Sequence, residues 1–190
     1  MIGERAAIFD LFDMYGQRKY LDTREARRFL AAARTADMPQ RLFCEVLFYT
    51  GCRISEALEL IPRRLDTSGR RIIFRTLKRR KLVYRAVPVP TRLMRDLEKH
   101  ARSLPEGEPL FPWCRVTGWR IVKSIMEQAQ IEGPQATPRG LRHQFGIHAI
   151  EAQIPESLLQ RWMGHAQART TRIYTVFGEG EERRLAERMW

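Results

Sequence analysis

Residues 70–90 read RRIIFRTLKRRKLVYRAVPVP, and this stretch decides the fold class. It contains two runs of β-branched and aromatic residues, 71–77 and 82–89, on either side of a basic middle. Two such runs around a short polar segment are typical of a β-hairpin. The sequence therefore predicts one small antiparallel hairpin with a positively charged tip.

The segments before and after the hairpin have the apolar spacing of amphipathic helices. Asp22 or Thr23 offers a first N-cap, Gly51 is a stop signal, and Thr117 is a candidate N-cap after the hairpin. The predicted helices cover residues 23–34, 39–50, 54–60, 90–102, 117–131, 138–152 and 155–162. We therefore expect a mainly α fold with a small antiparallel β-sheet, an α+β architecture.

The charge of the chain indicates a polyanionic partner. It has 34 basic against 22 acidic residues, for a formal charge of +12. Five of the basic residues are lysines and the other 29 are arginines, whose planar fork binds phosphate at two points. Nucleic acid is the first interpretation, and an arginine-rich genome composition is the alternative.

Several classes of site and location are disfavoured by composition. Cys44, Cys52 and Cys114 are odd in number and widely separated, which argues against a disulfide framework and for a reducing compartment. The histidines and cysteines show no zinc-ligand spacing. No stretch approaches the roughly 18 apolar residues of a membrane span. We expect a cytoplasmic, nucleoid-associated protein with no metal, no cofactor and no membrane partner.

Four short motifs follow one another along the chain. They are TGCRISE at 50–56, LRH at 141–143, GH at 164–165 and TTRIY at 170–174. Each alone has an ordinary explanation as a charged helix face or a core tyrosine. Together, and with the basic hairpin after the first, they resemble the tyrosine recombinase or phage integrase family over residues 21–177. As a short chain made almost wholly of the matching region, it is similar to the fimbrial-switch invertases.

The resemblance implies a site-specific DNA recombinase of the integrase, resolvase or invertase type. Such enzymes cut and rejoin DNA through a 3′-phosphotyrosine without metal or ATP. The implied roles are nucleophile for Tyr174, phosphate binding for Arg53, Arg142 and His165, proton donation to the leaving oxygen for Lys78, and support of the arginines for Glu56.

Two positions depart from the family pattern. The family usually has a histidine where this chain has Arg139, and an arginine cannot act as a base near neutral pH but can bind phosphate. The base is then His165, water or no residue, with His143 in a supporting role beside Arg142. The hairpin is about two residues longer than usual, so Lys81 is the alternative to Lys78.

The resemblance also sets expectations for domains and partners. We expect an N-terminal arm or short helix at 1–20, a catalytic domain at 21–177 and a C-terminal helix at 178–190, which either packs on its own domain or is exchanged between protomers. Most family members have a further DNA-binding domain before the catalytic one, and its place here is taken by about 20 residues. We therefore expect weaker or partner-dependent binding of double-stranded DNA.

The expected partners are double-stranded DNA, further copies of the chain in a dimer to tetramer on DNA, and an accessory DNA-bending protein. Two other functions use the same features. One is a catalytically weak or inactive recombinase-like DNA-binding regulator, and the other is a type IB topoisomerase-like relaxing enzyme.

Overall fold

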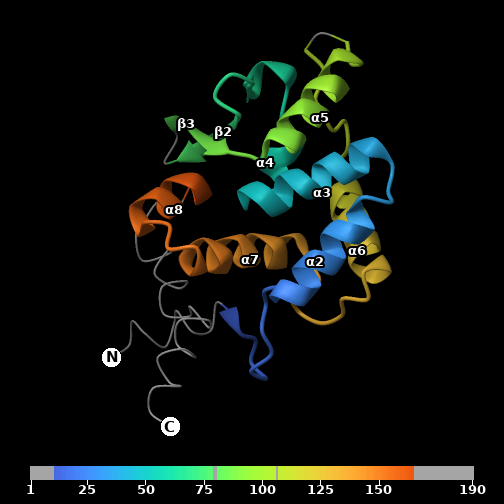
Figure 1. The fold of residues 1–190 in the computed structure, drawn as a ribbon, viewed down its shortest axis with the longest axis vertical. Coiled ribbons are helices and arrows are strands. Elements are labelled where there is room, and N and C mark those ends of the chain that lie inside the picture. The colour runs from blue at the N-terminus through green and yellow to red at the C-terminus, as the bar shows by residue number, and fades with distance from the viewer. Residues whose placement is uncertain (1–10, 79–80, 106, 165–190) are drawn as a thin grey trace.

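The computed structural model describes residues 11–78, 81–105 and 107–164, and the fold is the expected α+β architecture (Figure 1). The sheet lies at one side of a helical body. The described elements are α2 (Thr23–Ala33), α3 (Met38–Thr50), α4 (Ile54–Leu58), the 3₁₀ turn η1 (Pro62–Arg64), β1 (Leu65–Asp66), β2 (Arg71–Lys78), β3 (Lys81–Pro88), α5 (Thr91–Arg102), α6 (Arg115–Gln128), α7 (Pro138–Glu151) and α8 (Glu156–Met163).

The sheet is antiparallel throughout, in the order β1-β2-β3. Ile72 lies opposite Val87, and Phe74 lies opposite Arg85. These four side chains are buried, so one face of the hairpin covers the helical core. The hairpin was predicted, whereas β1 was not, because two residues are too short to show an alternating pattern.

Local capping chemistry sets several helix ends at the predicted places. The Asp22 carboxylate accepts the Glu25 backbone N–H at 2.8 Å, which closes the first turn of α2. Gly51 ends α3 in the left-handed region at φ 57°. The Thr137 hydroxyl accepts the Gly140 backbone N–H at 3.0 Å and begins α7.

Three predicted helix ends are wrong by two or three residues, and one of them is the end of α6, at Gln128 rather than at residue 131. α4 ends at Leu58 rather than at residue 60, because Pro62 disfavours helical backbone at the preceding residue and Ile61 is extended. α6 begins at Arg115 with Cys114 as its N-cap, so Thr117 lies inside the first turn. The Thr117 hydroxyl lies 3.3 Å from the Cys114 sulfur.

The main core joins the helices to the hairpin, with aromatic rings at its centre. The rings of Phe43 and Phe111 meet edge to face at 5.2 Å between centroids. A second apolar cluster joins the N-terminal segment to α7 and α8, and it buries Leu11 and Tyr20 almost completely. Leu11 and Tyr20 are therefore packed against α8 and against α7, the helix that carries Arg142.

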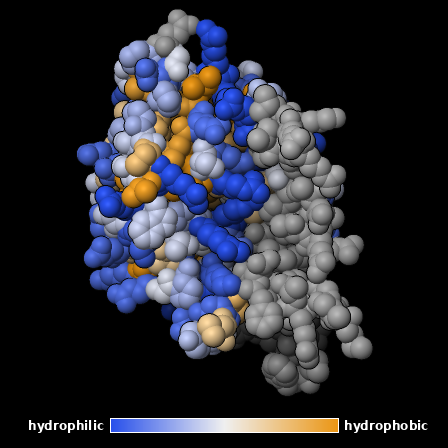
Figure 2. Space-filling view, turned by 180° about the vertical axis from the view of Figure 1, so that it is seen from behind, coloured by the Kyte–Doolittle hydropathy of each residue, from blue (hydrophilic) through white to orange (hydrophobic). Residues whose placement is uncertain are grey.

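The described surface is largely hydrophilic. Seen from behind, polar side chains cover much of it, and apolar side chains gather in a band (Figure 2). Val116 and Trp119 on α6 are among the exposed apolar side chains of the described residues. Within the described ranges, none of the helices has both the length and the apolar character to cross a membrane.

Candidate active site

Arg53 follows the glycine turn that ends α3 and is the N-cap of α4. The buried Glu56 carboxylate accepts the Arg53 backbone N–H at 2.7 Å, and Arg53 Nη1 lies 3.3 Å from its other oxygen. The Arg53 side chain keeps 46% of its surface exposed. Glu56 thus holds the backbone of Arg53 in place, while the Arg53 guanidinium reaches the surface.

Arg142 joins two chain segments that are far apart in sequence. From α7, its Nη1 donates to the Gly51 carbonyl at 2.5 Å and its Nη2 to the Met163 carbonyl at 2.8 Å. These bonds use two of the five N–H groups of a guanidinium and fix its plane. The sequence-predicted arginines Arg53 and Arg142 are therefore brought together at the Gly51 turn.

Arg139 and His143 lie one turn apart on α7 and interact directly. Arg139 Nε–H donates to His143 Nε2 at 3.2 Å. Burial, then the positive charges of Arg139 and Arg142, lower the pKa of His143 to about 3. His143 is therefore a neutral acceptor at pH 7, with its own proton on Nδ1, and it orients the exposed Arg139.

Lys78 and Lys81 lie at the turn end of the hairpin. Lys78 ends β2, Lys81 begins β3, and the two residues are direct register partners. The backbone positions of the two lysines therefore fit either of them as the general acid. His165 and Tyr174 lie outside the described residues, and the described part of the chain ends at Gly164, directly after α8.

Arg85 is a residue of this region that the sequence reasoning missed. It is 7% exposed, and its guanidinium forms a two-point ion pair with Glu56, at 2.9 Å and 2.7 Å. A signal was present, because strand alternation puts Arg85 on the same face as Val87, opposite Phe74. An arginine on a core-facing position needs a buried partner.

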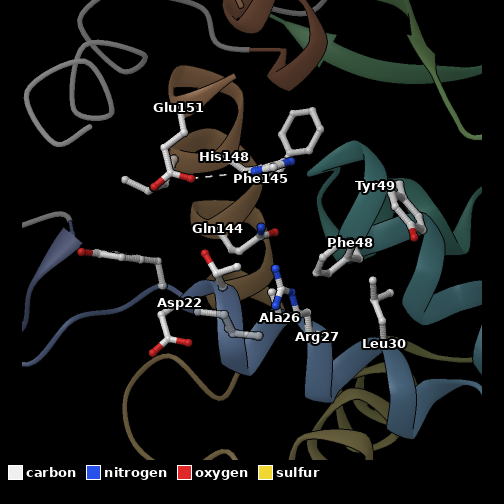
Figure 3. A pocket seen from close by; sticks show the side chains of 14 residues that line it. Asp22, Ala26, Arg27, Leu30, Phe48, Tyr49, Gln144, Phe145, His148 and Glu151 are labelled. Carbon is white, nitrogen blue, oxygen red and sulfur yellow. Dashed lines mark ion pairs between the residues drawn. The ribbon is translucent and has the colours of Figure 1, made fainter. Parts of the chain in front are cut away.

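A cavity of about 390 Å³ lies between α2, the end of α3 and α7 (Figure 3). At about 100° per residue, Gln144 and His148 lie on the face of α7 away from Arg142. The cavity walls include the apolar side chains of Phe48 and Phe145. The buried Gln144 Oε1 has no hydrogen-bond partner within the described part of the chain.

The described residues contain no group of three or more His, Cys, Asp or Glu side chains that could hold a metal ion. Cys44 and Cys52 are buried and free, and burial raises the pKa of each thiol to about 12. Neither thiol is therefore a nucleophile near pH 7.

The chain was compared with known protein families and proteins. Residues 19–178 match the Phage integrase family. The tyrosine recombinase XerA of Pyrococcus furiosus is 29% identical over 167 residues, which cover 83% of this chain and 57% of that protein. The tyrosine recombinase XerD of Corynebacterium glutamicum is 31% identical over 159 residues, which cover 75% of this chain and 50% of that protein.

A solved structure has the same fold. The XerH site-specific recombinase, bound to a palindromic difH substrate in a post-cleavage complex, superposes with a TM-score of 0.73 at 22% identity. The match covers 88% of this chain and 52% of that one. The chain spans about half the length of the relatives named here.

Proposed function

The chain belongs to the phage integrase family, the tyrosine recombinases, and from this membership we propose that it is a site-specific DNA recombinase. It cuts DNA strands, holds each cut end as a 3′-phosphotyrosine and joins it to a new strand. The observation that carries this proposal is the turn at Gly51, where Arg142 binds the carbonyl and Arg53 follows two residues later.

The proposed nucleophile is Tyr174. Its Oη attacks the phosphorus of a phosphodiester, a new P–O bond forms, and the bond from phosphorus to the 5′-oxygen breaks. The tyrosine loses its proton to a base and the leaving 5′-oxygen gains one, so charge and atoms balance. Because the new ester keeps the energy of the old one, a 5′-hydroxyl of another strand reverses the step without ATP.

Arg53 and Arg142 supply the electrostatic part of this mechanism. The attacked phosphate gains negative charge as the fifth bond forms, and guanidinium donors held in place stabilise that charge. A phenol with a pKa near 10 is only about one part in a thousand ionised at pH 7, so its attack depends on such donors. Arg139 adds a further cation that binds the DNA phosphates.

We assign the two proton transfers to residues of the hairpin and of the sequence that follows α8. His143 is a poor base, because its pKa of about 3 leaves it little affinity for a proton at pH 7. We assign the base to His165 or to water. Lys78 protonates the 5′-oxygen, and Lys81 is the alternative because it faces Lys78 across the hairpin end.

The proposed partners are double-stranded DNA, a DNA-bending accessory protein and further copies of the chain, at the nucleoid in the cytoplasm.

The sequence of residues 178–190 predicts a short helix with Leu185, Met189 and Trp190 on one side, and such an apolar stripe must be buried to be stable. We propose that it docks in the cavity between α2 and α7 of a neighbouring copy. Gln144, whose buried Oε1 has no hydrogen-bond partner within the described residues, lines this cavity.

Tyr174→Phe tests the proposed function. The variant keeps the aromatic ring but has no attacking oxygen, so it binds DNA as the wild type does and forms no SDS-resistant protein–DNA adduct. Wild-type protein on supercoiled plasmids with paired inverted-repeat sites should form adducts in excess EDTA. A Phe variant that still forms adducts would overturn the assignment of the nucleophile.

Two outcomes would indicate the other functions. Binding of DNA by the wild type with no adduct on any site indicates a regulator. Adducts accompanied by relaxation, with no exchange between paired sites, indicate a topoisomerase-like enzyme.

A further inference from the structure

Arg85 makes contacts in three directions from a buried position on β3. Its two Nη atoms donate to Glu56, and its Nε donates to the Trp162 carbonyl at 2.7 Å. Its Cζ lies 4.9 Å from the centre of the Phe74 ring. One side chain therefore links α4, the sheet and the end of α8.

The Glu56 carboxylate is shared between two arginines. Each of its oxygens has one contact to Arg53 and one to Arg85. A shift of Arg85 therefore moves the carboxylate that holds the backbone N–H of Arg53. The Arg85 side chain keeps only 4% of its surface exposed, so solvent screens this pair little.

The end of α8 rests on Arg85 and Arg142 together. The two arginines bind the consecutive carbonyls of Trp162 and Met163. Gly164, at φ 64°, lies so close that a Cβ there would be 3.1 Å from the Arg85 guanidinium. The backbone that leads toward His165 is therefore held against Arg85 as far as Gly164.

From these contacts we infer that Arg85 is a positioning residue for the reaction proposed above. It holds the end of α8, as far as Gly164, in place relative to Arg53 through Glu56. A buried ion pair adds little stability compared with apolar side chains of the same size. Stability alone therefore does not account for the shared carboxylate and the bond to Trp162.

The test separates positioning from stability with the double variant Glu56→Gln/Arg85→Met. The amide oxygen of the new glutamine still accepts the Arg53 backbone N–H, and no unpaired charge stays buried. Arg85→Lys keeps the positive charge but has a single nitrogen, which cannot take the places of Nε and both Nη atoms at once. The matched control removes the half-buried ion pair between α3 and α5, with Arg41→Met/Asp96→Asn.

The first readout is amide hydrogen exchange, which does not depend on catalysis. At equal global stability, exchange should rise together in residues 51–56 and 160–164 of the double variant and of Arg85→Lys, and not in the control. A rise in neither segment, or in one segment alone, overturns the inference, because Arg85 then does not couple the two.

The second readout is the rate of adduct formation at saturating DNA. A misplacement of about 1 Å lowers such a rate by on the order of 10²-fold, so both Arg85 variants should lose rate while the control does not. Full rates in folded variants would show a purely structural role. If the wild type forms no adduct, the proposed function fails, and hydrogen exchange alone decides the role of Arg85.

Discussion

His143 shows how burial changes the chemistry of one side chain. Burial and two neighbouring arginines lower its pKa to about 3, below the ordinary value of 6.5. Between these two values the unfolded chain binds one more proton than the folded chain. The free energy of unfolding therefore falls as the pH drops below about 6.5.

His143→Gln should flatten this pH dependence. A glutamine oxygen still accepts the Arg139 N–H, but it does not titrate. Between pH 6.5 and pH 4.5 the wild type should lose on the order of 1 kcal/mol per pH unit more than the variant, measured by urea unfolding at each pH. His148→Gln, at an exposed histidine, is the control. If the free energy of unfolding of His143→Gln depends on pH as steeply as that of the wild type, the argument is contradicted.

The general acid can be tested with a substrate that does not need one. A sulfur atom in place of the bridging 5′-oxygen leaves without a proton. Lys78→Ala should therefore lose roughly 10²-fold or more in cleavage on ordinary DNA and regain it on this substrate, whereas Arg53→Ala should stay inactive on both. Wild-type cleavage of ordinary DNA by Lys78→Ala would move the role to Lys81.

Single residues differ in how well the sequence alone predicts them. Arg53 and Arg142 were predicted because they stand in short motifs, and the structure brings them together at Gly51. The neutral state of His143 was not predicted, because it depends on burial among residues from other segments. The role of Arg85 was missed because its partner Glu56 lies 29 positions earlier in the chain.

Helix α7 carries three of the site residues, and its start depends on one glycine. A Cβ on Gly140 would overlap with the Gln135 carbonyl oxygen, a backbone atom that cannot move aside alone. Gly140→Ala should therefore cost about 1–3 kcal/mol or more in the free energy of unfolding, although alanine favours helix.

The same substitution on α6 is the matched control for Gly140→Ala. A Cβ on Gly118 would lie 3.0 Å from the tip of the Phe43 ring, which is a side chain and can shift. Gly118→Ala should thus cost less than Gly140→Ala in urea unfolding. An equal or larger cost at Gly118 would show that the Gln135 carbonyl yields easily.

The elements were predictable where local chemistry decides them. The start of α2, the end of α3 and the start of α7 follow from an Asp, a Gly and a Thr at caps. The start of α6 was wrong because its cap is a cysteine, which gives a weak sequence signal. β1 exists only through pairing with β2, a contact that no local pattern records.

In the molecule as a whole, the site is built from separate segments held by few bonds. The turn after α3, the middle of α7 and the end of α8 meet through Arg142, while β3 joins through Arg85. A charge of +12 favours binding to DNA, but it does not align strands from two sites. We propose that contacts between copies of the chain supply this alignment.

Removal of residues 178–190 tests those contacts. A chain cut after Phe177 should fold, bind a single DNA site with unchanged affinity and fail to form the multimer on DNA with two sites. The reason is that avidity from linked copies, commonly about 10²-fold or more, is lost with the docking segment. Light scattering of the protein–DNA complexes gives the mass of each species.

Single substitutions then locate the docking site itself. Trp190→Ala should weaken the multimer as truncation does, and Gln144→Leu should weaken it from the receiving side, because it removes a polar side chain that lines the cavity. Trp119→Ala, at an exposed tryptophan on α6, should leave it intact. If the truncated chain unfolds as a monomer, residues 178–190 stabilise their own copy. If it assembles as well as the full chain, they play no part in assembly, and in either case exchange between copies is refuted.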